Sequence, residues 1–376
     1  MRSTSSTLAL AEERRSLRRF ARVRWGLFVA ALLLSAVGLA TVHSASSELA
    51  VDYLPRQAIW VGLGLIAFVL AFSFDYQLLT KFSLLFYLAS LGTLVAVLFL
   101  GYRSGGAQSW FALGGVQIQP AEFAKLATAL MLARYLGGLN QDRLRVGEIA
   151  VAGLITGLPM SLIVLERDLG GAAMFVPLLA GALLVAGVRW KLVAAAAVVA
   201  VVVGIVAWNF FLLDYQRERV LTFLDPEREP QGAGYQLRQS KIAVGSGQMT
   251  GRGYMQGTQS QLRFLPARHT DFIFAVLAEE RGFLGVVSVL LLYGFYVANG
   301  ARVAIRARDR TGVLLVVCLL SVASFHVLYN TAMVVGLVPI TGIPLPFLSY
   351  GGSFTLANFA AAGLILNVDF RRHVNR

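Results

Sequence analysis

A carboxylate stands where a long polar segment re-enters an apolar part of the chain. Residues 261–282 read QLRFLPARHTDFIFAVLAEERG, and Asp271 directly precedes their apolar part. Ionisable groups at membrane depth are costly, so they are rare and usually mark a substrate path or a catalytic site. Thr270 followed by Asp271 before an apolar helix is also typical of a helix N-cap. The residues alone give these two interpretations of Asp271 equal weight.

Opposite charges also lie at the start of an apolar run, in the sequence QPAEFAK of residues 119–125. Pro120 at the first helical position and Glu122 in the first turn suit a helix N-terminus and its dipole. Glu122 and Lys125 are three residues apart, so they can pair on one helix face. A helix start explains Glu122 well, but it explains Lys125, which lies one turn deeper, less well. Lys125 is therefore a candidate contact for a pyrophosphate.

Three further acidic residues need partners. Asp168 follows an apolar run and either caps a helix or lines a polar cavity. Glu279 lies eight residues after Asp271, about 12 Å further along a helix axis and rotated by about 80°, which places both on nearly the same side. We expect Glu280 to point away from them and to pair with Arg281 or another neighbour.

A glycine-punctuated run, GSGQMTGRGYMQG, occupies residues 245–257. Its backbone N–H groups could cradle a phosphate or pyrophosphate beside Arg252. An ordinary turn-rich loop is the alternative, and the spacing alone favours it. The preceding residues 235–244 have the spacing of an amphipathic helix in the membrane interface. Their Lys241 is a further candidate for a diphosphate contact.

Residues 341–353, TGIPLPFLSYGGS, are too apolar for a solvated turn and predict a re-entrant segment packed inside the protein. His326 lies in mid-span and is expected to be a hydrogen-bonded core residue rather than a proton relay. The role of His269 stays open. The sequence contains no Walker loop, nucleophile elbow, zinc spacing or Rossmann fingerprint. We therefore expect neither a nucleotide-activated donor nor ATP hydrolysis.

Composition indicates that these residues are positioned by membrane helices. The chain has 376 residues, of which 57% are hydrophobic and 14% charged, against about 25% charged in an average soluble domain. We expect an all-α, polytopic integral membrane protein with about ten transmembrane helices and a long, partly helical extracellular loop. The apolar runs long enough to span a bilayer are residues 25–42, 57–74, 82–100, 120–136, 149–165, 171–187, 192–213, 272–298, 312–338 and 353–370.

Arginine and lysine in the short loops set the orientation. They concentrate on the side of the N-terminus, which predicts that both termini are cytoplasmic. The expected organisation is a basic cytoplasmic segment (1–24), transmembrane helices 1–7 (25–213), an extracellular loop (214–271), transmembrane helices 8–10 (272–370) and a cytoplasmic tail (371–376). The net charge of +13 follows from this bias and from contact with anionic membrane lipids. Nucleic-acid binding is not expected, because the basic residues form no aromatic-laced patch.

The apolar run 272–298, which precedes the last two apolar runs, is too long for a single span. Residues 272–298 would form about 40 Å of helix, against roughly 30 Å of hydrocarbon. Their continuous apolar part begins only at Gly282. We therefore expect residues 271–281 to form helical turns at or above the outer interface.

Five stretches of the chain resemble the SEDS family of bacterial cell-wall proteins (shape, elongation, division and sporulation). They are residues 105–125, 167–175, 235–247, 257–282 and 342–353. Ser109 and Arg167 depart from the family pattern, so they take no role from it. The resemblance implies a bacterial cytoplasmic (inner) membrane protein that polymerises lipid II into glycan strands. It also implies that Asp271 is essential, and that a class B penicillin-binding protein, a transpeptidase, is the partner.

Polymerisation requires a sugar hydroxyl to attack the anomeric carbon of a donor whose leaving group is undecaprenyl diphosphate. A positioned carboxylate as general base is the expected device, and Asp271 is the candidate. The leaving group needs cationic stabilisation, for which Lys125, Lys241 and Arg252 are candidates. Glu122 would place Lys125 or help to hold a divalent cation such as Mg²⁺. A single displacement inverts the anomeric carbon, so an α-linked donor gives a β-1,4 product.

Asp168 and Glu279 complete the candidate substrate-binding set. Two other functions remain open at this point. A lipid II flippase would suit ten helices with intramembrane charges, but the charges gather at the outer face and no clear internal repeat is visible. A non-catalytic scaffold for the transpeptidase would tolerate substitution of the outer polar residues.

Overall fold

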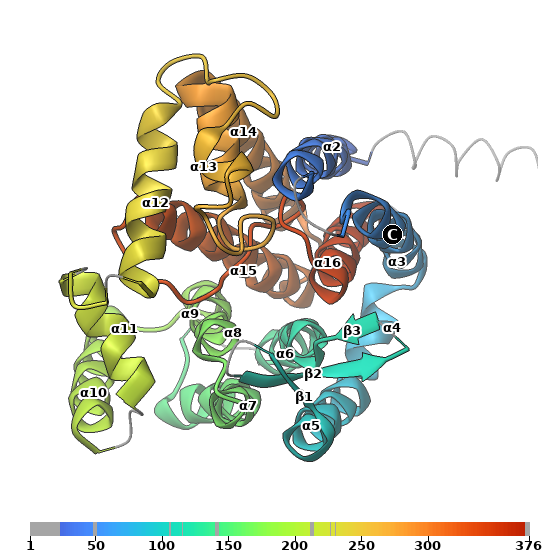
Figure 1. Ribbon diagram of the computed structural model, residues 1–376. Coiled ribbons are helices and arrows are strands. Elements are labelled where there is room, and N and C mark those ends of the chain that lie inside the picture. The colour runs from blue at the N-terminus through green and yellow to red at the C-terminus, as the bar shows by residue number, and fades with distance from the viewer. Residues whose placement is uncertain are drawn as a thin grey trace, which may run out of the picture.

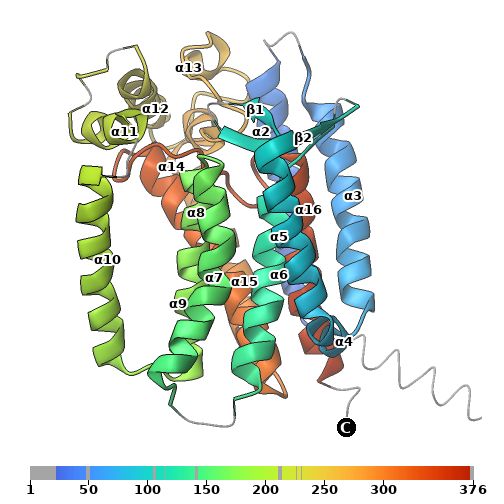
Figure 2. The same ribbon diagram turned by 90° about the horizontal axis from the view of Figure 1, so that it is seen from below.

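The computed structural model describes residues 23–47, 51–104, 107–114, 116–139, 143–210, 214–225, 227–229 and 231–372. Long helices run side by side through the molecule, and a layer of short helices, strands and loops covers one end of them (Figure 2). The long helices are α2 (Gly26–Ser46), α3 (Leu54–Ser73), α5 (Ser83–Leu100), α6 (Pro120–Gly137), α7 (Val146–Leu165), α9 (Phe175–Ala186), α10 (Trp190–Phe210), α14 (Ile273–Arg306), α15 (Arg310–Val334) and α16 (Gly352–Arg371).

The membrane-spanning helices agree with the expected number. Within the described ranges, eight helices are long and apolar enough to cross a membrane, when the short α8 (Leu169–Ala173) is joined to α9. The charged α6 and the more peripheral α10 run alongside them (Figure 2). Together they match the ten apolar runs. We call the layer of short helices, strands and loops the outer layer. At the opposite end of the bundle, α4 (Tyr76–Lys81) links α3 to α5 (Figure 2).

Helices α15 and α16 lie inside the bundle, with α2, α3, α6, α9 and α14 around them (Figure 1). Glycines let α3 and α16 approach closely, as is common between membrane helices. A Cβ at Gly363 would lie 2.5 Å from the carbonyl oxygen of Phe68. A Cβ at Gly352 would collide with the Trp60 ring. The α3–α16 contact therefore fixes where α16 begins, next to the re-entrant segment.

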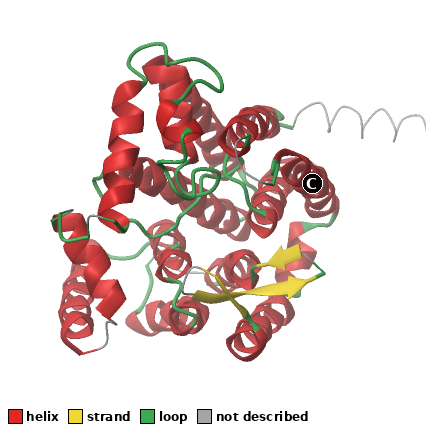
Figure 3. Ribbon diagram, viewed as in Figure 1, coloured by secondary structure: helices red, strands yellow, loops and turns green. Residues whose placement is uncertain are grey.

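The outer layer contains three helices, α11 (Asp214–Leu224), α12 (Ala233–Ser246) and α13 (Thr258–Gln261). It also contains a small antiparallel sheet of β1 (Tyr102–Ser104), β2 (Ala107–Leu113) and β3 (Val116–Ile118), in the order β1-β2-β3 (Figure 3). The all-α expectation overlooked these strands. Their signal is present in the sequence, because a Gly-Gly pair between two β-prone runs is typical of a hairpin.

Helix α14 is broken at Gly282, whose φ of 63° and ψ of −165° are not helical. The break lies where the sequence predicts that the outer helical turns end. The break leaves backbone groups of α14 without partners in the helix, and residues of the glycine run form hydrogen bonds with them. The carbonyls of Glu279 and Glu280 accept the N–H groups of Arg252 and Gly253, at 3.0 and 3.1 Å. In return, the N–H groups of Phe283 and Leu284 donate to the carbonyls of Gln248 and Met249, at 2.8 and 3.1 Å.

The sheet is tied to the end of α7 beside a buried acid. The N–H of Gln108 in β2 donates to the carbonyl of Glu166, at 3.0 Å. The Glu166 side chain is buried, at 1% exposure. Burial raises the pKa of Glu166 to about 8, the charge of Asp168 raises it further, and the hydroxyl of Ser109 opposes the shift. Glu166 therefore favours its protonated form in the folded protein.

The helix break predicts the effect of Gly282→Ala. An added Cβ would lie 2.7 Å from the backbone N of Thr250 and closer still to that of Gly251, in a backbone region that only glycine adopts readily. We expect the free energy of unfolding to fall by at least about 1–3 kcal/mol, the usual cost of such strain. Thermal unfolding of the purified protein in detergent measures it. Gly294→Ala is the control, because nothing lies within 4 Å of that Cβ. Equal melting temperatures of the two variants would contradict the proposed packing.

The burial of Glu166 predicts a pH dependence of stability. Its pKa in the folded state lies above the reference value of 4.5, so the folded state keeps a proton that the unfolded state releases. Its contribution to stability is therefore present below about pH 4.5 and is lost as the pH rises toward 8. In Glu166→Gln, melting temperatures across this interval should fall less steeply than in the wild type. Glu227→Gln, which removes an exposed acid, should keep the wild-type slope.

Candidate active site

Asp271 lies at the outer end of the bundle, in the turn that leads into α14. The helix begins at Ile273 with Phe272 as its N-cap residue, so Asp271 precedes the cap position. The helix-cap interpretation of Asp271 is therefore wrong. Its N–H donates to the carbonyl of Ala267 at 3.1 Å, and its carbonyl accepts from the amide of Asn330 at 2.8 Å. These backbone contacts hold the residue in place, and its half-buried carboxylate points toward Gly342, where a Cβ would lie 3.4 Å away.

The predicted re-entrant segment, residues 341–353, packs largely within the protein, between α15 and the start of α16. Leu345, Leu348 and Ser349 are fully buried. The Ser349 hydroxyl donates to the carbonyl of Thr270 at 2.7 Å and accepts the N–H of Leu345 at 2.8 Å. The amide of Asn330 donates to the carbonyl of Ile343 at 2.7 Å. The re-entrant segment thus holds the residues that flank Asp271.

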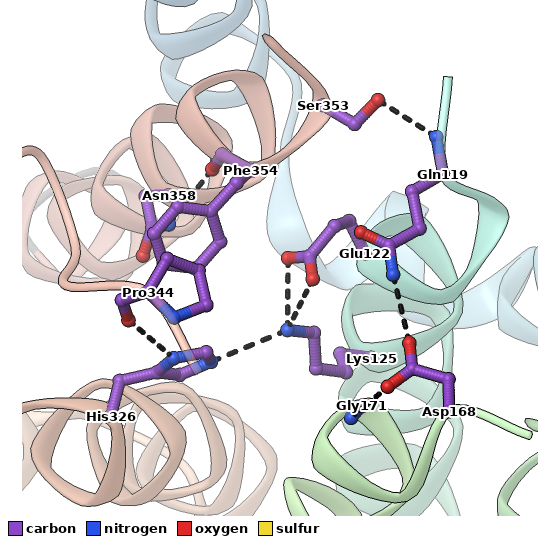
Figure 4. Close-up of polar contacts among 10 residues, drawn as sticks. All are labelled: Gln119, Glu122, Lys125, Asp168, Gly171, His326, Pro344, Ser353, Phe354 and Asn358. Atoms are coloured by element: carbon purple, nitrogen blue, oxygen red, sulfur yellow. Dashed lines mark hydrogen bonds and ion pairs between the residues drawn. The ribbon is translucent and has the colours of Figure 1, made fainter. Parts of the chain in front are cut away.

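A buried charged cluster lies deeper in the bundle (Figure 4). The Lys125 ammonium lies 2.8 Å from both carboxylate oxygens of Glu122 and 3.4 Å from Nε2 of His326. His326 Nδ1 lies 3.0 Å from the carbonyl of Pro344, and the ring of Phe354 packs over His326 at 5.0 Å. The side chains of Glu122 and Lys125 are 8% and 6% exposed. The predicted pair is present, and His326 is the hydrogen-bonded core residue that was expected.

Asp271 and the cluster belong to different layers of the site. Asn330, which holds Asp271, and His326, which holds Lys125, are one turn apart on α15, or about 6 Å along its axis. A cavity of about 30 Å³ is lined by Glu122, Lys125 and His326, but Asp271 does not line it. Asp271 and Lys125 therefore do not share this cavity. The carbonyl of Ile343 is bound by Asn330 in the layer of Asp271, and the carbonyl of Pro344 by His326 in the layer of Lys125.

Asp168 connects the starts of three helices at the outer end of the bundle. It is the N-cap of α8, where its carboxylate accepts the N–H of Gly171 at 2.8 Å. The other carboxylate oxygen accepts from the amide of Gln119 at 2.9 Å (Figure 4). The N–H of Gln119, next to α6, donates to the hydroxyl of Ser353 in α16 at 2.9 Å. Asp168 thus serves as the cap that the sequence allowed, and it also holds the beginning of α6.

The side chain of Glu279 holds α13, and that of Glu280 holds the glycine run. Glu279 is fully buried and accepts the N–H groups of Gln259 and Ser260, at 2.8 and 3.1 Å. Glu280 accepts from the Ser44 hydroxyl and from the N–H of Met255. The expectation that Glu280 pairs with Arg281 or another neighbour is wrong, because its hydrogen-bond partners lie far from it along the chain. The spacing of residues around Glu280 could not reveal them.

The two candidate cations of the outer segment differ in their surroundings. Lys241 lies on α12, with its side chain directly over Gly336 in the turn that follows α15. Arg252 is exposed, and its N–H belongs to the α14 break. The N–H groups of residues 251, 252, 253, 255 and 256 all donate within the protein. These five groups are therefore occupied, which favours the turn-rich loop over a phosphate cradle in this part of the glycine run.

Aromatic rings surround the residues just before Asp271, a feature that the sequence analysis missed. His269 stacks on Tyr53, with ring centroids 4.5 Å apart and planes 10° apart. The carbonyl of His269 accepts the N–H of Tyr350 at 2.9 Å. Burial lowers the pKa of His269, and the charge of Arg268 lowers it further. A neutral imidazole therefore lies two residues from the candidate base.

A divalent ion would find few protein ligands here. Within the described ranges, no three His, Cys, Asp or Glu side chains gather as a metal-binding group. Mg²⁺ often binds through one or two carboxylates together with phosphates of the substrate. Asp271, together with diphosphate oxygens, fits that pattern, whereas Glu122 is occupied by Lys125.

Comparisons with known proteins agree over nearly the whole chain. The family model of the cell cycle proteins FtsW, RodA and SpoVE matches residues 24–374. Peptidoglycan glycosyltransferase MrdB of Escherichia coli K12 is 36% identical over 348 residues, which cover 92% of each chain. Peptidoglycan glycosyltransferase RodA of Treponema pallidum is 31% identical and covers 92% of this chain and 97% of its own.

Two solved structures share the fold. One describes a peptidoglycan synthase complex that coordinates polymerization and crosslinking; its matching chain is 34% identical with a TM-score of 0.82, covering 93% of this chain and 98% of its own. The rod shape determining protein RodA of Thermus thermophilus is 30% identical with a TM-score of 0.69, covering 93% and 97%. The protein is thus a RodA-like, multi-pass membrane protein, and it belongs to the SEDS family of FtsW, RodA and SpoVE.

Proposed function

We propose that this protein is a peptidoglycan glycosyltransferase that polymerises lipid II during cell elongation, with Asp271 as its general base. The observation that carries the base assignment is the placement of Asp271. Its backbone is fixed by Asn330 and Ala267, while its carboxylate stays half-buried at the outer boundary of the bundle. The relatives MrdB and RodA, whose matches each cover 92% of this chain, are named peptidoglycan glycosyltransferases, which supports the reaction class.

The carboxylate has the position that the chemistry requires. An acceptor hydroxyl is a weak nucleophile, so a base within hydrogen-bond reach speeds its attack. A fully buried carboxylate would be closed to a sugar, and a fully exposed one would not be held in place. Asp271 takes the proton as the hydroxyl oxygen bonds to the anomeric carbon and the diphosphate leaves with the electron pair of the broken bond. The anomeric centre is inverted in this single step.

Stabilisation of the leaving diphosphate is assigned to cations of the outer layer. Lys241 and Arg252 are exposed there, and Lys241 lies over Gly336 in the turn that follows α15. Lys125 is the deeper candidate, although Glu122 and His326 already surround its ammonium. A contact between Lys125 and the substrate requires that one of these partners be exchanged. Asp168 and Glu279 would support the site through the segments that they hold.

The outer layer is proposed to face the extracellular side, with both termini in the cytoplasm. The distribution of arginine and lysine among the short loops supports this orientation. The bacterial cytoplasmic membrane then presents the lipid-linked donor and acceptor to Asp271 from its outer leaflet. The solved complex that couples polymerization to crosslinking supports a class B penicillin-binding protein as partner. The donor's own diphosphate bond supplies the free energy, so no nucleotide is needed.

The base assignment predicts that Asp271→Asn loses activity without losing structure. The substitution keeps the backbone contacts to Asn330 and Ala267 and removes only the proton acceptor. Polymerisation of lipid II in detergent should fall by about 10²–10⁴-fold, the usual contribution of a general base. Asp225→Asn, on an exposed acid of the outer segment, is the matched control and should keep full activity. Normal glycan strands from folded Asp271→Asn would refute the assignment.

The same assay separates this function from its alternatives. Detergent micelles offer no bilayer to cross, so a flippase would form no polymer there. A scaffold would bind its transpeptidase partner and still form no strands. Polymer formed by the wild-type protein in this assay, and lost in Asp271→Asn, is the outcome that only the glycosyltransferase predicts.

Lys125 requires a paired substitution. Removing one partner of a buried ion pair leaves the other uncompensated and costs about 3–5 kcal/mol of stability, so a single variant is ambiguous. Glu122→Gln combined with Lys125→Met removes both charges. Because no buried charge is left unpaired, we expect this double variant to stay folded. If the ammonium acts on the diphosphate, its turnover should fall by at least about tenfold, the effect of a lost electrostatic contact in the transition state. Wild-type turnover of the double variant would show that the pair is only structural.

A further inference from the structure

His326 joins the two layers of the site. It lies on α15 and is 3% exposed. One ring nitrogen faces the Lys125 ammonium at 3.4 Å, and the other faces the carbonyl of Pro344 at 3.0 Å (Figure 4). His326 thus contacts both the charged pair and the re-entrant segment. Neither the fold nor the base assignment accounts for a histidine at this position.

The partners of His326 define its protonation state. The carbonyl of Pro344 can only accept a hydrogen bond, so Nδ1 carries the proton. Nε2 then has a free lone pair and accepts from the ammonium of Lys125, which can only donate. A second proton on Nε2 would face a cation. His326 is therefore neutral, with its proton on Nδ1.

The ammonium of Lys125 is fully coordinated by this arrangement. It has three N–H donors. Two of them reach the carboxylate oxygens of Glu122 and the third reaches Nε2 of His326. The cavity beside them holds only about 30 Å³, and the ring of Phe354 packs against both His326 and Lys125. The charged pair thus has little freedom to move relative to the histidine.

The histidine also sets the position of the re-entrant segment. Two side chains one turn apart on α15 bind consecutive carbonyls of that segment: Asn330 binds Ile343 and His326 binds Pro344. Ile343 and Leu345 each precede a proline, which disfavours helical backbone at both, so residues 343–346 form a stiff piece of chain. Asn330 binds the carbonyl of Asp271 as well. A shift of His326 would therefore be transmitted to the segment against which the Asp271 carboxylate lies.

We infer that His326 is a positioning residue, which fixes the re-entrant segment beside Asp271 relative to the Glu122–Lys125 pair. This inference rests on the proposed function of Asp271. In this arrangement Lys125 contributes through its place in the chain of contacts Glu122–Lys125–His326–Pro344. His326 itself contacts neither the substrate nor the reacting atoms.

Three substitutions of His326 separate its two contacts. Gln places an acceptor near the former Nε2 and keeps the contact to Lys125. Asn places a donor near the former Nδ1 and keeps the contact to Pro344. Leu fills the space and keeps neither. Thr331→Val is the control on the same helix, because the Thr331 hydroxyl bonds only to carbonyls of α15. The assay is polymerisation of lipid II in detergent, with kcat, KM and melting temperature measured for each variant.

For His326→Leu we expect kcat to fall by about tenfold to hundredfold, as misplacement of a catalytic group by about 1 Å does, with a smaller change in KM. Gln and Asn should each recover part of the loss at a melting temperature equal to that of Leu. Thr331→Val should match the wild type. If Leu keeps the wild-type kcat, or if all three variants lose activity in proportion to their melting temperatures, the inference is wrong. Activity in Asp271→Asn would instead overturn the proposed function.

Discussion

The structure depends on one constraint, which is that backbone polar groups inside a membrane must be bonded within the protein. Two stretches near the outer boundary leave the helical conformation, and in both the freed groups find partners. At Gly282 the broken α14 exchanges four hydrogen bonds with the glycine run. In the re-entrant segment, carbonyls are bound by side chains of α15. Asp271 lies against the second of these stretches, and Asn330, which binds a carbonyl of that stretch, also binds the carbonyl of the candidate base.

Helix α15 acts as the common reference for both layers. Its Asn330 binds the backbone of Asp271 and of the re-entrant segment, and one turn deeper His326 binds that segment and Lys125. Because a helix is stiff and rises 1.5 Å per residue, the separation of the two layers is built into the spacing of two side chains. The re-entrant segment therefore cannot slide along α15 without breaking hydrogen bonds to both of them.

Local features of the site could be predicted from the sequence, whereas partners distant in the chain could not. Helical spacing was enough to predict the Glu122–Lys125 pair, and hydropathy was enough to predict the spans and the helical turns that end near Gly282. Glu280 shows the limit, since its partners Ser44 and Met255 come from other segments. The arrangement of Asp271 and Lys125 in two layers could not be predicted for the same reason. It depends on how α15 and the re-entrant segment pack, and spacing along the chain carries no information on that.

The buried ion pair is better explained by position than by stability. Desolvation of two charges offsets most of their attraction, so apolar side chains would serve as well in a core that needed only packing. The pair is kept together with a neutral histidine that completes the coordination of the ammonium. Such a cluster has a single favourable geometry, and it binds the re-entrant segment through a directional hydrogen bond, which apolar contacts cannot provide. Asp271 can thus remain half-exposed to a sugar while the charges that order its surroundings stay shielded from water one turn below.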